Sequence, residues 1–210
     1  MSDVRHTPVD FDPFAEVDAS FALTEPQREM IAAALMGDEA NASYNQAFLI
    51  ALDGPLSIES MRNALAAVVR RHEALRVAID LENESQRVLD DVAIELPLTD
   101  LSTLTEAERE AAIARIAEHE MRAPFDLAKA PLWRAGIVRE SPTRHRLVFT
   151  AHHVIVDGWS SAVIFGDLAK AYAADRFGSS VAFMGLAAVA AGGLAMIFLV
   201  MPETRRIAEA

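Results

Sequence analysis

The sequence contains no cysteine, so disulfide bonds and thiol chemistry are excluded. Basic residues are also few: 19 lysines and arginines stand against 31 acidic residues, which gives a net charge of −12. An acidic protein repels the phosphates of nucleic acid, so no nucleic-acid partner is expected. The first twenty residues contain several acids and no apolar run. They carry no secretory signal, and we expect the body of the protein to be cytoplasmic.

Charge is absent from one long segment near the C-terminus. No residue between Gly178 and Met201 is charged, and arginines lie on both sides of the segment, at Arg176 and Arg205. About 20 apolar residues in a helix cross the ~30 Å hydrocarbon layer of a bilayer. We therefore expect a transmembrane helix at residues 181–201 that anchors the body to the cytoplasmic membrane.

The preceding part of the chain alternates between helical and strand-like patterns. Helices are expected where a capping residue precedes the segment or where apolar residues recur every three or four positions. They are expected at 25–36 after Thr24, from Ser57 to Val69, at 104–121 and from Ser160. Strands are expected in short apolar runs, at 46–52, 75–80, 92–97, 132–138 and 145–156. The turn Ser141-Pro142 should pair the last two strands. This order predicts a mixed α/β layer with the helices packed on one face.

The segment AHHVIVDGWS, residues 151–160, is the strongest candidate for a functional site. Two histidines end an apolar run, and the turn signal Asp157-Gly158 follows. A histidine at the end of a strand projects from a rigid element, and the ordinary pKa of its imidazole suits proton transfer. Glycine allows the backbone to approach a ligand. A buried Asp157 would need a cationic partner, for which Arg70, Arg71 and Arg76 are available.

Simpler interpretations of the same residues remain open. His153 and Asp157 are four residues apart, a spacing that could hold a metal ion on a helix. The β-branched residues between them disfavour a helix, and no third ligand is near in the sequence. The pair could instead be a core histidine beside a surface turn. Trp159 is expected in the core.

Several segments occur together in an order that resembles the condensation domains of nonribosomal peptide synthetases. HHVIVDGWS resembles the HHxxxDG signature of that family. The other similar segments are LTEPQREM (23–30), Ser43-Tyr44-Asn45, GPL (54–56), RRHEALRVAI (70–79) and APFDLAKAPLWRAGI (123–137). Together they cover about residues 20–174.

The resemblance implies an acyltransferase that forms amide bonds. In this family an acyl thioester on the phosphopantetheine arm of one carrier protein is attacked by an amine held on a second carrier. No cofactor is bound directly, and the arm enters as the carrier of the substrate. The partners implied are therefore acyl or peptidyl carrier protein domains.

The resemblance also implies roles for particular residues. His153 is the catalytic candidate, and His152 supports the site. Asp157 is structural and pairs with an arginine, for which we expect Arg71, with Arg76 as the alternative. The backbone amide of Gly158 is a candidate oxyanion donor.

Members of this family consist of two halves, each resembling chloramphenicol acetyltransferase, with the active tunnel between them. The histidine motif closes the first half. The resemblance therefore predicts an α/β (α+β) two-layer sandwich, a half-domain at residues 21–174 after a loose lead at 1–20. Such a chain would need a complementing half-domain or a second copy for activity. The alternatives are a non-catalytic, truncated or fused remnant and a membrane-anchored module that binds carrier proteins.

The segment that follows the half-domain has a different resemblance. Residues 175–210 are expected to form a junction, the helix at 181–201 and a short tail. This segment resembles the last membrane helix of a major facilitator superfamily transporter. Because a folded body without a signal precedes the span, we expect a tail anchor with the C-terminus outside the membrane.

Overall fold

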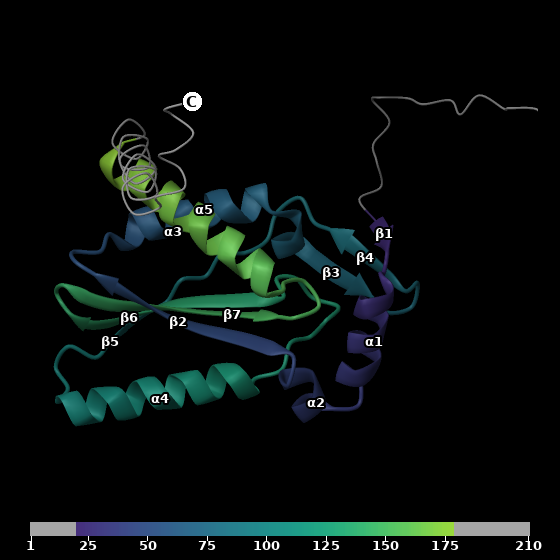
Figure 1. Cartoon of the computed structure of the whole chain (residues 1–210), viewed down its shortest axis with the longest axis horizontal. Coiled ribbons are helices and arrows are strands. Elements are labelled where there is room, and N and C mark those ends of the chain that lie inside the picture. The colour runs from purple at the N-terminus through teal and green to yellow at the C-terminus, as the bar shows by residue number, and fades with distance from the viewer. Residues whose placement is uncertain (1–19, 179–210) are drawn as a thin grey trace, which may run out of the picture.

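The computed structural model of the chain describes residues 20–178 (Figure 1). The expected lead and the expected transmembrane helix at 181–201 lie outside the described residues, apart from Ser20. The strands are β1 (Ser20–Ala22), β2 (Asn45–Asp53), β3 (Val77–Asp80), β4 (Ser85–Val88), β5 (Leu98–Asp100), β6 (Trp133–Ser141) and β7 (Arg144–His152). The helices are α1 (Glu25–Ala34), α2 (Asp38–Ala42), α3 (Ile58–Arg71), the 3₁₀ helix η1 (Glu73–Arg76), α4 (Glu106–Arg122) and α5 (Gly158–Phe177).

A four-stranded sheet in the order β2-β7-β6-β5 forms the centre of the structure. The expected pairing of the two strands around Ser141-Pro142 is confirmed, because β6 and β7 run antiparallel with Trp133 opposite Ala151. On its other side β7 pairs antiparallel with β2 over nine residues, which places Asn45 opposite His152. The start of β2 therefore lies beside the end of β7, where the histidines are.

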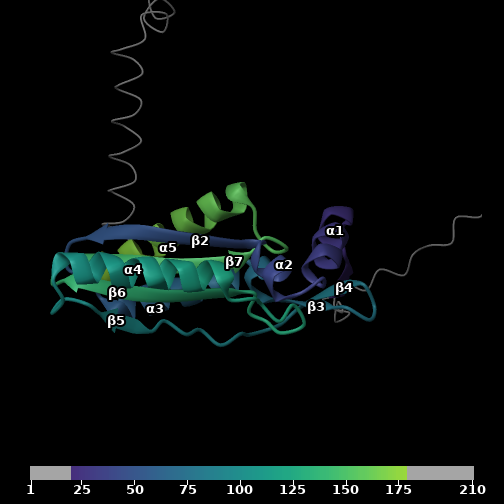
Figure 2. The ribbon, with the colours of Figure 1, turned by 90° about the horizontal axis from the view of Figure 1, so that it is seen from below.

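Helices cover both faces of this sheet, so the predictions of a two-layer sandwich and of helices on one face are wrong. Figures 1 and 2 show α3 and α5 on one face and α4 on the other. The reason is that the central strands are apolar on both sides. Phe149 belongs to the large core beneath α3 and α5, whereas its neighbour Val148 packs with Ile113 of α4.

A second, three-stranded sheet in the order β1-β4-β3 lies beside the first, next to α1 (Figure 1). A strand was expected at 75–80. Its first two residues belong instead to the 3₁₀ helix η1, and the remaining four form β3. The strand expected at 92–97 is not formed. Val92 and Leu96 are buried there in an irregular segment. Pro97 ends that segment, and its carbonyl accepts a hydrogen bond from the amide of Ile137, at 2.8 Å.

Two expected helix starts are confirmed by their capping contacts. Thr24 precedes α1 in a capping box with Gln27, and the side chain of Ser57 accepts from the amide of Ser60 at the start of α3. The last helix begins at Gly158, two residues before the expected start at Ser160. It continues to Phe177, so residues 175–177, where the junction was expected to begin, belong to its last turn. None of the helices within residues 20–178 is both long enough and apolar enough to span a membrane.

Candidate functional site

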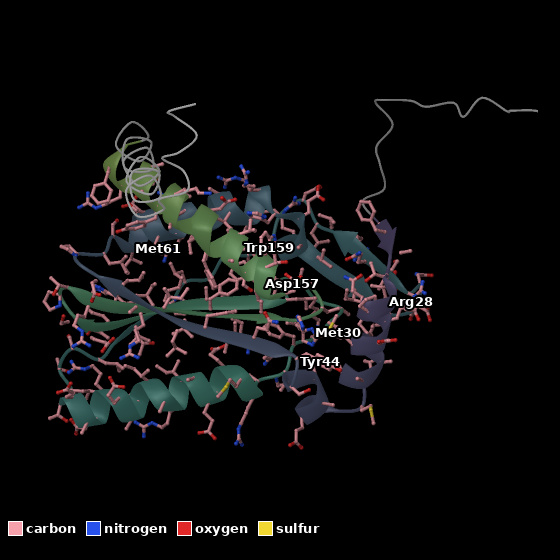
Figure 3. All side chains as sticks on the ribbon, viewed as in Figure 1. Arg28, Met30, Tyr44, Met61, Asp157 and Trp159 are labelled. Atoms are coloured by element: carbon pink, nitrogen blue, oxygen red, sulfur yellow. The ribbon has the colours of Figure 1, made fainter. Side chains whose placement is uncertain are left out.

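The histidine motif lies where β7 ends and α5 has not yet begun. The strand stops at His152, and the amide of Ile155 donates to the carbonyl of His152 at 3.1 Å, which turns the chain. Figure 3 shows Asp157 and Trp159 at the beginning of α5, and Tyr44 just before β2. The motif therefore forms a short loop between a strand and a helix, close to the start of a second strand.

His152 is fully buried. Its Nδ1 accepts a hydrogen bond from the amide of Val154 at 3.1 Å, and its Nε2 has no partner among the described residues. The ring packs near the rings of Tyr44 and Phe125, with centroids 5.8 and 6.2 Å away. Burial, and then the neighbouring His153, lowers the pKa of His152 to about 4. His152 is therefore neutral at pH 7 and acts as part of the core beneath the loop.

His153 is only half buried and is held mainly through one ring nitrogen. Its backbone amide donates to the carbonyl of Tyr44 at 2.8 Å. Its Nδ1 lies 2.6 Å from the carbonyl oxygen of Val156 and 2.9 Å from the side-chain amide nitrogen of Gln46. A carbonyl can only accept, so the contact with Val156 requires a proton on Nδ1. In that tautomer Nε2 carries a lone pair that can take up a proton.

Asp157 does not form the predicted ion pair with Arg71 or Arg76. It is exposed and caps α5: its Oδ1 accepts from the amide and the hydroxyl of Ser160, at 2.7 and 2.6 Å. These hydrogen bonds from Ser160 lower the pKa of Asp157. The carboxylate is therefore satisfied locally and by solvent, and it needs no arginine.

The two arginines have other partners because the end of α3 faces the middle of α5 rather than its start. Nε of Arg71 lies 3.0 Å from Oδ2 of Asp167, and Nε2 of His72 lies 3.1 Å from the same oxygen. Arg76 donates to the backbone carbonyls of Val69 and Leu89. The arginine motif thus does connect α3 with α5, but through Asp167, ten residues beyond the predicted partner.

Gly158 is exposed at the first position of α5. Amides in the first turn of a helix lack partners within the helix and can bind a developing negative charge. Within the described residues, a Cβ added at Gly158 would meet no atom within 4 Å, so local packing does not require glycine here. Trp159 was expected in the core, but it is 82% exposed in the first turn of α5, so that expectation is wrong.

Two glutamines contribute to the loop and were not predicted as site residues. The side-chain amide of Gln27, at the start of α1, donates to the carbonyl of Val154 at 3.1 Å. Gln46, in β2, contacts His153. The signal for Gln46 was present in the sequence, because it is a polar residue at the start of the otherwise apolar strand QAFLIAL. For Gln27, the sequence offered only its place in the segment LTEPQREM.

Three grooves of the described residues, with volumes of 470, 480 and 490 Å³, are lined by neither His153 nor Gly158. No three His, Asp or Glu side chains of residues 20–178 converge into a metal-binding group. His153 is half buried just after the end of β7.

Comparison with known proteins identifies the family of the chain. The family model described as Condensation domain matches residues 17–184, which is most of the chain. The chain belongs to the condensation domain family. Chondramide synthase cmdD of Chondromyces crocatus is 39% identical to it over 139 residues, which cover 65% of this chain and 4% of the synthase. Tyrocidine synthase 3 of Brevibacillus parabrevis is 35% identical over 162 residues, or 76% of this chain and 2% of that protein.

Solved condensation domains share the fold. The first condensation domain of the calcium-dependent antibiotic synthetase, in complex with a substrate analogue, superposes with a TM-score of 0.67 at 25% identity over 76% of this chain. A mutant starter condensation domain of the rhizomide synthetase RzmA superposes with a TM-score of 0.68 at 24% identity over 74% of the chain. The chain spans 38% and 37% of the lengths of these two structures.

Proposed function

We propose that this condensation-type chain supplies the histidine wall of an acyltransferase site that forms amide bonds in nonribosomal peptide synthesis. The observation that carries the proposal is the contact of 2.6 Å between Nδ1 of His153 and the carbonyl of Val156. It leaves Nε2 of a half-exposed histidine free to accept a proton, as a general base must. The substrates are an acyl thioester on the phosphopantetheine arm of one carrier protein and an amine on another.

In the proposed reaction the amine nitrogen attacks the thioester carbonyl, and a C–N bond forms. Nε2 of His153 takes the proton released by the amine. The carbonyl oxygen becomes an oxyanion, which the amide of Gly158 stabilises. When the C–S bond breaks, the proton passes from His153 to the departing sulfur, so the histidine returns to its starting state. His152 remains neutral and supports the ring from below, and Asp157 fixes the start of α5.

We further propose that a complementing half-domain or a second copy closes the site around His153. Rate acceleration requires that both reactants be held in a closed, water-poor site. Here His153 is half exposed, and the described grooves do not reach it. Condensation by this chain alone is therefore not expected.

The domain organisation and localisation belong to the same proposal. We place the condensation half-domain at residues 21–174, after a lead at 1–20 and before a junction, helix and tail at 175–210. The body is cytoplasmic and is anchored by residues 181–201, whose uncharged sequence resembles the last membrane helix of a major facilitator superfamily transporter. That sequence also supports the second candidate function, a membrane-anchored module or fused remnant that binds carrier proteins without catalysis.

A condensation assay with carrier-bound substrates tests the function. Product is measured by mass spectrometry for the chain alone and with the second half of a condensation domain added as a separate polypeptide. We expect product only in the second case, and its loss in His153→Ala. Product from the chain alone that disappears in His153→Ala would contradict the need for a second half. Binding of carrier proteins without product in either case would favour the non-catalytic module.

A further inference from the structure

The ring of His153 has two polar neighbours that make conflicting demands on the same nitrogen. The carbonyl of Val156, 2.6 Å from Nδ1, accepts and requires a proton on Nδ1. The side-chain NH₂ of Gln46, 2.9 Å from Nδ1, donates and requires a bare nitrogen. One ring nitrogen cannot meet both demands at once. The conflict ends if one neighbour presents a different atom.

Gln46 is the neighbour that can change. The carbonyl of Val156 belongs to the backbone and has no other atom to offer. A glutamine amide carries an acceptor and a donor in one planar group, and half a turn exchanges them with almost no change in shape. The Oε1 of Gln46 is buried and has no partner among the described residues. Half a turn would bring this oxygen to the proton on Nδ1.

We propose that Gln46 is a positioning residue whose amide oxygen, together with the carbonyl of Val156, holds His153 in the Nδ1–H tautomer. This inference deepens the proposed function and rests on it. Two acceptors at Nδ1 fix the plane of the ring and keep the lone pair on Nε2. When Nε2 takes a proton from the amine, the charged ring faces two oxygens, and hydrogen bonds to a charged donor are stronger than neutral ones.

The test is the position of the ring proton, measured without substrate. The full chain is labelled with ¹⁵N-histidine, and long-range ¹H–¹⁵N correlations report which ring nitrogen carries hydrogen. A His153→Gln spectrum identifies the signal of His153. We expect the Nδ1–H tautomer in the wild type and in Gln46→Glu, which keeps an oxygen. In Gln46→Met, which has a similar length but no such acceptor, the ratio of Nδ1–H to Nε2–H should fall about fivefold, the effect of losing one ordinary hydrogen bond.

Gln86→Met is the matched control. Gln86 is a half-buried glutamine that contacts Gln27 and not His153, so its replacement should leave the ratio unchanged. An Nε2–H tautomer in the wild type, or the wild-type ratio in Gln46→Met, would overturn the proposal. If the Met variant fails to fold, an Nε2–H tautomer in the wild type still overturns the proposal. An Nδ1–H tautomer in a chain that shows no condensation even with the second half added would refute only the proposed function. An Nε2–H tautomer in a chain that is active with that half would refute the role of Gln46 but not amide formation.

Discussion

The buried His152 should make the stability of the protein depend steeply on pH between about 6.5 and 4. In the unfolded chain the imidazole has its ordinary pKa of 6.5, whereas in the folded protein burial lowers the pKa to about 4. Between these values the unfolded state binds a proton that the folded state does not. The contribution of neutral His152 to the free energy of unfolding is thus fully present above pH 6.5. It is lost as the pH falls, and the loss is complete near pH 4.

The size of this loss follows from the pKa difference of about 2.5, from 6.5 to about 4. One pKa unit corresponds to about 1.4 kcal/mol, so the whole loss is about 3 kcal/mol, and roughly 2 kcal/mol of it should appear between pH 7 and pH 5. The side chain of His152 is fully buried, so solvent does not screen the effect. Burial also lowers the pKa of His145, which adds a loss of the same sign.

Urea unfolding at pH 7, 6 and 5, followed by circular dichroism, measures the effect in wild type and in His152→Asn. Asparagine does not titrate but keeps an acceptor near the position of Nδ1, where the amide of Val154 donates. The variant is expected to be less stable at pH 7 but to lose about 2 kcal/mol less on going to pH 5. His119→Asn, at an exposed histidine of α4, is the control and should retain the wild-type fall. Equal falls in wild type and His152→Asn would refute the reasoning.

Two further predictions concern the cap and the tail. Asp157→Ala should cost about 1 kcal/mol of unfolding free energy in urea, as the loss of an N-cap does. A loss of 3 kcal/mol or more would instead indicate a buried ion pair. Arg71 is bound to Asp167, so the effects of Arg71→Ala and Asp157→Ala on the free energy of unfolding should be additive in the double variant. Residues 181–201 should hold the chain in the membrane fraction after a carbonate wash, and a C-terminal tag should be digested by protease added to intact cells. Release by carbonate would contradict the anchor, and a protected tag would contradict its orientation.

The features that could be predicted from the sequence are those fixed by neighbouring residues. The side chain of Ser57 accepts from the amide of Ser60, and the side chain of Gln27 accepts from the amide of Thr24, so both helix starts follow from local chemistry. The turn at Ser141-Pro142 likewise sets the pairing of β6 with β7. In contrast, the sequence did not show which face α4 would cover, because the central strands are apolar on both sides and accept a helix on either.

The partner of Arg71 shows why a motif could not supply the contact. Asp157 caps α5 and Asp167 lies in its middle. Ten residues of α-helix rise about 15 Å, so the two carboxylates lie far apart along the same helix. Only the packing of α3 against α5 decides which of them meets Arg71, and it selects Asp167. A carboxylate next to a histidine motif was therefore a reasonable but insufficient reason to predict an ion pair.

The environment of His153 depends on the register of one strand pair. β2 and β7 pair over nine residues with Asn45 opposite His152, and this register brings both Tyr44 and Gln46 into contact with His153. Adjacent residues of a strand point to opposite faces, so a slip of one residue would put Ala47 or Asn45 where Gln46 now contacts His153. The register is fixed in turn by the apolar residues that both strands bury, such as Phe48 opposite Phe149. The packing of the core thus determines which polar atoms reach the imidazole and which of its nitrogens is left free.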